Sequence, residues 1–371
     1  MAAPGSHPKN GFLVAILLIT VSALFSFAVY IWTRSYQQEI AFSDAETKRA
    51  GTLSAISNRL ETYSNLMYTI QALYSTQGDL TKTAWDSYLQ SLDIFNRYPG
   101  ITGVVYMEKV MQSELPAYIE RLNQEYNGKI AGLNVFPEEN KPEYCIIAYS
   151  MLNPSRDWTN AIGYDASSEA RRLTAMRLAT DLAQPVATER LPLVINPDNS
   201  DSFIVYLPLY HDGESFDSVE ERRNGLRGFV ALAFQIDAVV ESVYAPYGAL
   251  QLQELKIYDV TDTNGEKTES NLLYVRDGES QNGNSSNTLY IDFAHRKWSV
   301  DFTDPIDPEV EKQLEILNYL ILIMVFLSSS ASLLTLYSYF NIRRQRKELA
   351  QRKAPYQNQP LCASPSSHNI K

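Results

Sequence analysis

The sequence has few of the residues that build metal centres and disulfide frameworks. It holds 2 cysteines and 4 histidines among 371 residues. Cys145 and Cys362 lie on opposite sides of a long apolar run, and neither belongs to a Cys-x-x-Cys motif or a Cys/His cluster. This spacing predicts no metal site and no intrachain disulfide, and we expect no cofactor. Because Cys145 lies in the apolar run YCIIAY, we expect it to be a buried, inert thiol.

Motifs of the common enzyme classes are also missing. The sequence contains no P-loop, no GxGxxG, HExxH or GxSxG pattern, and no EF-hand loop. His211 and His295 lie in different predicted subdomains, which argues against a histidine-based triad or metal site. We therefore predict that the chain is not an enzyme. A carboxylate-based extracytoplasmic hydrolase is the alternative, because the many acidic residues cannot be paired by inspection.

The sequence does contain two long runs without charge. Gly11–Trp32 has 22 residues and Ile316–Phe340 has 25. A membrane-spanning helix needs about 20 apolar residues, so we predict spanning helices over 11–32 and 314–340. A cleaved signal peptide is the alternative for the first run. Its length, the lack of an Ala-x-Ala site and its terminal aromatic residues favour an uncleaved anchor.

The charges beside these runs predict the orientation. Segment 341–371 has seven Lys or Arg residues and one acid, Glu348. Positively charged flanks stay in the cytoplasm. We therefore expect 1–10 and 341–371 on the cytoplasmic side of a bacterial inner (plasma) membrane and the segment between the spans on its outer, periplasmic side. Between the runs there are 24 basic and 42 acidic residues, a net charge of −18. This negative charge argues against nucleic acid and anionic lipid as partners of the segment between the spans. The two spanning helices are themselves expected to contact the lipid bilayer.

The last 31 residues form a basic tail that we expect to be disordered, because it is rich in Gln, Pro, Ser and Asn. A domain usually needs about 50 residues or more. The sequence therefore predicts no kinase, cyclase or phosphodiesterase module after the second span. A separate kinase or cyclase at the cytoplasmic face is the expected output partner.

A heptad pattern follows the first run. Its apolar residues are spaced alternately by three and four: Leu53, Ile56, Leu60, Tyr63, Met67, Ile70 and Tyr74. This seam predicts a stalk helix over 33–80 that pairs as a coiled coil in a parallel homodimer. The alternative is a helix that packs the seam on its own domain, and the two arrangements can hold on different portions of the helix.

The remaining outer segment mixes helices and strands, which predicts an α+β fold with two lobes, 81–245 and 246–310. Helices are expected over Thr83–Phe95, Ser113–Tyr126 and Ser167–Leu182. Strands of the first lobe are expected over Gly100–Val110, Glu143–Met151, Val186–Ile195, Ser202–Tyr210 and Gly225–Ile236. Alternating segments predict a four-stranded meander in the second lobe, over Leu255–Thr261, Asn271–Asp277, Thr288–His295 and Lys297–Asp304.

Five blocks, in order, resemble the CHASE sensory domain over about Tyr74–Tyr244. They are RYPGITGVVYMEKV (97–110), AIGYDASSEARRLTAMRLATD (161–181), VATERLPLV (186–194), FIVYLPLYHDG (203–213) and LRGFVALAF (226–234). CHASE domains lie outside the membrane in bacterial sensor kinases and cyclases and in plant cytokinin receptors. The resemblance implies a long helix followed by two PAS-like antiparallel-sheet lobes, with the ligand in the distal lobe, 81–245.

The resemblance gives Asp165 a specific role. In the plant receptors the acid at this position accepts hydrogen bonds from the adenine ring of the ligand. From the residues alone, Asp165 is also a preferred cap for the helix that follows. The two roles are compatible because a carboxylate has two oxygens.

Further ligand contacts are expected from the strands that flank this acid. The predicted pocket walls are Tyr106, Tyr144, Trp158, Leu193, Val205, Leu207 and Phe229, and Thr188 would add a hydroxyl. Ordinary core packing is the alternative for each wall residue. Arg171, Arg172 and Arg177 are expected to face solvent or to pair with acids rather than to bind an anion.

These observations predict a two-pass receptor of the CHASE type that binds an unidentified small molecule outside the membrane. CHASE domains normally adjoin an output module, and the sequence predicts none here. A truncated or degenerate sensor that acts as a non-signalling periplasmic scaffold is therefore the alternative.

Overall fold

The computed structural model describes residues 9–77, 80–130, 132–152, 161–193, 202–211, 216–244, 254–276, 286–303 and 308–353. The chain divides into two compact units. One unit comprises residues 1–44 and 307–371, and the other comprises residues 45–306.

The first unit contains the start of helix α1 (Lys9–Gln77) and helix α8 (Pro308–Lys353). Each contains an apolar stretch long enough to cross a membrane, of which 11% is buried in α1 and none in α8. Leu24 and Leu327 are more than half exposed. A long helix that exposes this much apolar surface is a candidate to cross a membrane. The predicted spans lie within these two helices.

In the second unit, α1 packs its heptad seam on the chain's own sheet. Six of the seven seam residues, from Ile56 to Tyr74, are almost completely buried. Tyr63 stacks on Phe234 with ring centroids 5.3 Å apart, and Tyr74 lies 5.9 Å from Tyr106. This is the alternative arrangement of the stalk. The seam is not free to pair with a second copy, as the coiled-coil prediction requires, because its side chains already have partners.

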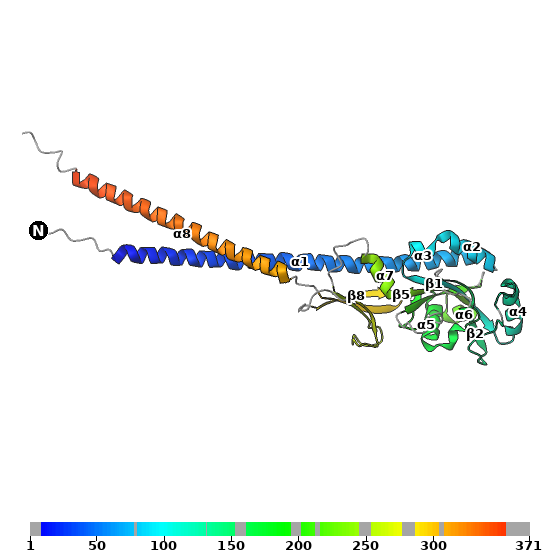
Figure 1. Cartoon of the computed structure of the whole chain (residues 1–371). Coiled ribbons are helices and arrows are strands. Elements are labelled where there is room, and N and C mark those ends of the chain that lie inside the picture. Colours follow the sequence, from blue (N-terminus) through cyan, green and yellow to red (C-terminus); the bar gives the residue numbers. More distant parts are fainter. Residues whose placement is uncertain are drawn as a thin grey trace, which may run out of the picture. The chain divides into compact units, whose positions relative to one another are not determined.

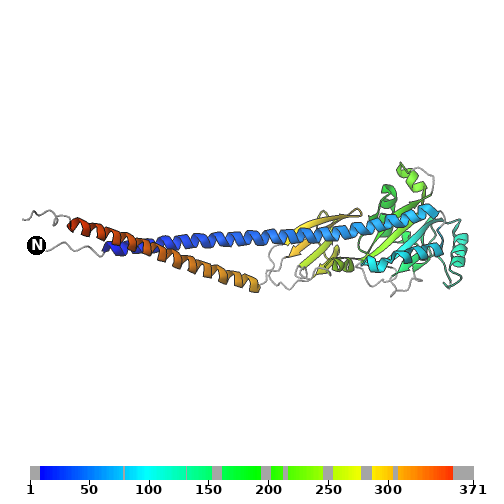
Figure 2. The same ribbon diagram turned by 90° about the horizontal axis from the view of Figure 1, so that it is seen from above.

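Five antiparallel strands form the sheet under α1, in the order β2-β1-β5-β4-β3. Their bounds are β1 Ile101–Met111, β2 Glu143–Leu152, β3 Val186–Ala187, β4 Ser202–Tyr210 and β5 Leu226–Gln235. Helices α1, α2 (Lys82–Leu92) and α3 (Ile94–Arg97) lie on one face, and α5 (Ala170–Leu182) lies on the other (Figure 1). Figure 2 shows the same unit from above. The sheet is therefore covered on both faces, which explains why its strands are apolar throughout.

The expected elements of this lobe form with some changes. The helix predicted over Thr83–Phe95 divides into α2 and α3 at Asp93, whose φ is 49°. The helix predicted over Ser113–Tyr126 forms as α4 (Leu115–Glu125). The strand predicted over Val186–Ile195 is wrong in length, because β3 ends at Ala187. Two short helices complete the lobe, α6 (Val219–Asn224) and α7 (Ile236–Tyr244).

The second sheet is not the predicted meander. Its strands are β6 Glu254–Asp259, β7 Leu272–Arg276, β8 Ser286–Phe293 and β9 Arg296–Thr303, in the order β7-β6-β9-β8. Strands β6 and β7 form one hairpin, and β8 and β9 form another. The two hairpins are joined by the pairing of β6 with β9. This order puts the two strands with the most buried side chains, such as Ile257 and Val300, at the centre. This sheet meets the first through Trp298 of β9, whose ring packs against the edge of Phe203 with centroids 5.2 Å apart.

Candidate functional site

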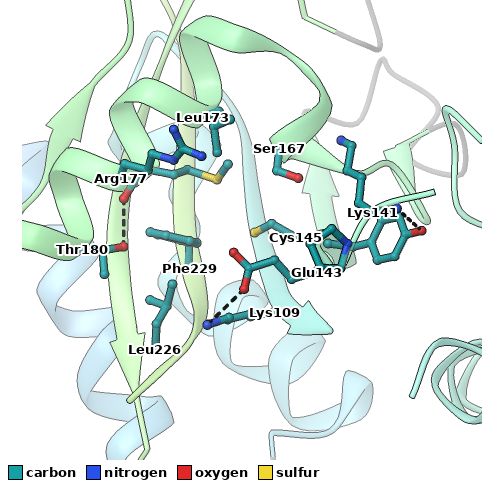
Figure 3. A pocket seen from close by; sticks show the side chains of 13 residues that line it. Lys109, Lys141, Glu143, Cys145, Ser167, Leu173, Arg177, Thr180, Leu226 and Phe229 are labelled. Carbon is teal, nitrogen blue, oxygen red and sulfur yellow. Dashed lines mark hydrogen bonds and ion pairs between the residues drawn. The ribbon is translucent and has the colours of Figure 1, made fainter. Parts of the chain in front are cut away.

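A cavity of about 270 Å³ lies between α5 and the strands β1, β2 and β5 (Figure 3). This volume lies just below the roughly 300–1,000 Å³ that is common for ligand sites, so the cavity suits a molecule at the small end of that range. Its apolar lining comes from Leu173, Met176, Leu226 and Phe229, and its polar lining includes Lys109, Lys141, Glu143, Ser167, Arg177 and Thr180. An apolar surface with a few polar groups is typical of a small-molecule site.

Three cations and one carboxylate line the cavity: Lys109, Lys141, Arg177 and Glu143. Lys109 pairs with Glu143 at 3.3 Å, and Lys141 lies 2.8 Å from Asp165 and 2.9 Å from Glu139. Partial burial acts to lower the pKa of Lys141, but the two carboxylates outweigh it and the pKa is raised. Lys141 therefore remains a cation at neutral pH. Two of its three N–H donors bind Asp165 and Glu139, which leaves one for a ligand.

Asp165 lies behind this rim rather than on the cavity surface. Its side chain is 1% exposed, and it is not a lining residue. Oδ1 accepts hydrogen bonds from the backbone N–H of Cys145 (2.9 Å), the N–H of Ser167 (3.1 Å) and the Ser167 hydroxyl (2.6 Å). Oδ2 accepts from the Lys141 ammonium at 2.8 Å. The carboxylate thus holds Lys141 and Ser167, both of which line the cavity.

The predicted capping role of Asp165 is confirmed, but for a different element. It caps the short 3-10 helix η2 (Ala166–Ser168). Helix α5 begins later, at Ala170, and its cap is Glu169, which accepts from the N–H of Arg172 at 3.0 Å. The helix predicted over Ser167–Leu182 is therefore two elements with separate caps.

A glycine turn brings Asp165 to strand β2. Gly163 has a φ of +87°, and a Cβ there would lie 2.4 Å from the carbonyl oxygen of Asn134. Only glycine fits this backbone and this close approach without strain. The turn lets Asp165 form an isolated bridge with Ile146 of β2.

The structure brings only some of the predicted pocket residues together. Tyr144 and Phe229 line the cavity under α5. Leu193 lines a smaller cavity nearby. Thr188 lines a third hollow, to which α5 and Arg296 also contribute lining residues. The Thr188 hydroxyl accepts from the N–H of Ile204 at 3.1 Å. Trp158 lies outside the described residues.

Three predicted wall residues face the opposite side of the sheet. Tyr106 packs against Tyr74 and Trp85, on the side of α1 and α2. Val205 and Leu207 share a face with Phe203, because side chains alternate along β4. Phe203 in turn stacks on Phe234, which contacts α1. These three residues are core under α1 and do not line the cavity under α5.

Arg172 is the residue for which the sequence interpretation was wrong. Arg171 pairs with Glu169 at 2.7 Å, as expected, and Arg177 is exposed. Arg172, however, is only 4% exposed. No carboxylate of the described residues pairs with it, and its Nε has no hydrogen-bond partner. No sequence signal separates it from its neighbour Arg171, because only the packing of α5 on the sheet distinguishes them.

The other polar groups of the site have ordinary roles. Cys145 is free and buried, which confirms the burial that the sequence predicts. Burial also raises the pKa of its thiol well above the usual range. Lys141 and Ser167 were not foreseen as lining residues, because each is a single polar residue in a stretch without a motif. Within the described ranges, no three His, Cys, Asp or Glu side chains are grouped to hold a metal ion.

Comparison with known proteins gives a family match. The family model for the CHASE domain matches residues 78–274, more than half of the chain. An extracellular ligand binding receptor from Desulfohalobium retbaense DSM5692 is similar in structure, with a TM-score of 0.41 and 12% sequence identity. The similarity covers 69% of this chain and 39% of that one, so the chain matches about two fifths of its length. A search of curated proteins found no match.

Proposed function

The chain belongs to the CHASE-domain family, and on that premise we propose that it is a membrane-anchored sensor of a small molecule. The observation that carries this proposal is the cavity under α5, which has an apolar surface and a polar rim within the matched segment. A non-signalling scaffold would not need such a cavity. We propose no catalytic role, since the described residues around the cavity form no nucleophile–base pair.

The lining supports a ligand with an apolar body and hydrogen-bond acceptors. Phe229 and Met176 offer apolar surface, and Lys141 offers an N–H donor. The Ser167 hydroxyl already donates its hydrogen to Asp165, so it offers its oxygen as an acceptor. Asp165 would act as a positioning residue that holds both side chains. For Asp165 to touch the ligand itself, the residues that bury it would have to move, because its side chain is 1% exposed.

Packed side chains connect this lobe to α1 and to the second sheet. Helix α5 lies on β4, and Phe203 of β4 contacts both Phe234, which stacks on Tyr63 of α1, and Trp298 of the second sheet. We propose that the ligand favours one position of α5 on the sheet, and that Phe203 transmits the change. A ligand shifts such an equilibrium only by its differential affinity for the two states.

The wider assembly follows the same proposal. The two sheets would be PAS-like lobes, 81–245 distal and 246–310 membrane-proximal, on a stalk formed by α1. Helices α1 and α8 would cross the membrane with both ends in the cytoplasm, where a separate kinase or cyclase receives the signal. A homodimer would have to use faces of α1 other than the buried seam.

A thermal-shift screen tests the ligand site. The full chain in lipid nanodiscs is melted with a small-molecule library, because a ligand that binds the native state raises the Tm. Lys141→Met should abolish the shift of any hit that occupies the cavity. Lys129→Met is the matched control, since Lys129 is exposed and lies outside the cavity lining.

The outcomes separate the three candidate functions. Hits that lose their shift in Lys141→Met but not in Lys129→Met support the sensor. A library without hits favours the scaffold. Turnover of an ester, phosphate or peptide substrate that disappears with a carboxylate substitution would favour the hydrolase instead.

A further inference from the structure

Arg172 is a buried cation. Its side chain is 4% exposed, and it forms no ion pair in the described part of the chain. Nη2 donates to the carbonyl oxygen of Pro192 at 3.2 Å, whereas Nε is buried without a partner. The guanidinium also lies 5.2 Å from the ring centroid of Tyr164. The Tyr206 hydroxyl also accepts a side-chain hydrogen bond from Arg172. A carbonyl, a hydroxyl and a ring face satisfy only part of a group that has five N–H donors.

This guanidinium borders a small apolar cavity that is distinct from the larger one. The cavity measures about 40 Å³. Strand residues such as Val105, Ile147 and Ile204 line it together with Arg172 and Tyr206. A buried water needs roughly 10–15 Å³ on this scale, so the space suits about three waters or one carboxylate with a short alkyl group.

An unpaired buried cation is costly to the folded protein. Removing a charge from water is unfavourable unless hydrogen bonds and an opposite charge replace the hydration. A carboxylate is the natural complement, because the guanidinium donates two parallel hydrogen bonds to its two oxygens. The apolar strand residues would contact the alkyl group of such an ion, whereas a strongly hydrated inorganic anion would gain nothing from them.

We propose that the cavity beside Arg172 is a second binding site, which takes a small aliphatic monocarboxylate of the acetate or propionate type. The carboxylate would bind the guanidinium, and the alkyl group would lie against the β1, β2 and β4 side chains. This site does not depend on the proposed function, since Arg172 does not line the larger cavity.

Propionate is the probe that tests the site. The full chain is melted in nanodiscs, with Trp85 and Trp298 as buried fluorescent reporters. Sodium propionate should raise the Tm in a saturable way relative to sodium chloride at the same ionic strength. Propionamide, which has nearly the same shape and no charge, should not. Equal stabilisation by propionamide or by chloride would overturn the proposal, as would no stabilisation by propionate.

Arg172→Met then separates a binding role from a structural one. This variant should weaken propionate binding about tenfold or more, because a charge-assisted hydrogen bond is lost. It should also leave the Tm without propionate unchanged or higher, since it removes an unpaired buried charge. A lower Tm, or failure to fold, would mean that Arg172 is a structural residue and would refute the proposal.

Two further variants complete the test. Arg172→Lys keeps the charge but loses the two parallel donors, so propionate should bind more weakly than to the unmodified chain yet more tightly than to Arg172→Met. Arg171→Met is the matched control, because Arg171 is partly exposed and pairs with Glu169. A propionate response lost equally in Arg171→Met would contradict a site built on Arg172.

Discussion

Replacing Asp165 with alanine should destabilise the outer domain more than the loss of a helix cap. An exposed N-cap contributes about 1 kcal/mol. Here the same carboxylate also accepts from the buried N–H of Cys145 and from the ammonium of Lys141. A buried donor left without a partner costs about 1–3 kcal/mol. Lys141 can turn to Glu139 and to solvent, so it adds little. The expected loss is about 2–4 kcal/mol.

Thermal melting of the full chain in nanodiscs measures this loss. For a domain of this size 1 kcal/mol corresponds to roughly 2–4 °C, so the Tm of Asp165→Ala should fall by about 5–15 °C. Glu169→Ala is the matched control, because Glu169 caps α5 through the N–H of Arg172 and is partly exposed. Its Tm should fall by only about 2–4 °C.

The comparison of the two caps can refute the reasoning. Equal losses in Asp165→Ala and Glu169→Ala would show that the bonds to Cys145 and Lys141 contribute nothing. A higher Tm in Asp165→Ala would show that the carboxylate destabilises the ligand-free protein, as expected for a buried charge whose partner is the ligand. That result would restore direct ligand contact as the main role of Asp165.

Two further predictions concern the backbone and the response to acid. Gly163→Ala should lower the Tm more than Gly265→Ala, because both glycines have a φ of +87° but only the first Cβ would meet another residue; equal losses would show that Asn134 moves aside freely. Hydrogen bonds from Arg223 lower the pKa of Asp181, so this pair stabilises the fold above about pH 4, and the contribution disappears as the pH falls through the folded-state pKa. The Tm of Asp181→Asn, measured from pH 3 to pH 7, should therefore fall less steeply below pH 4 than that of the unmodified chain, and parallel curves would contradict the pairing.

Local patterns in the sequence determined most elements of this protein. Charge-free runs identified the two candidate spans, and the spacing of apolar residues identified the long helix, α4 and four strands of the first sheet. These predictions succeed because periodicity reports which residues share a face, and the backbone must form its hydrogen bonds within the segment or with a neighbouring strand. The block around Asp165 was also identified as a capped turn and as a carrier of the family resemblance.

Tertiary packing decided what each face meets. A heptad seam is equally suited to a second helix and to a sheet, and only the folded chain puts Tyr63 on Phe234. Strands that are apolar on both faces do not reveal which face lines a cavity, so Tyr106 and Val205 could not be separated from Phe229. The order β7-β6-β9-β8 depends on a pairing between strands far apart in the sequence.

The two arginines at the start of α5 show the same limit most directly. Arg171 and Arg172 are adjacent and chemically identical, yet one pairs with Glu169 near the surface and the other is buried beside an apolar cavity. A rotation of about 100° between successive helical residues separates solvent from core, and the sequence does not specify where that rotation begins. Helix α5 acquires its orientation only when its apolar face packs on the sheet, and that packing decides which arginine could meet a ligand.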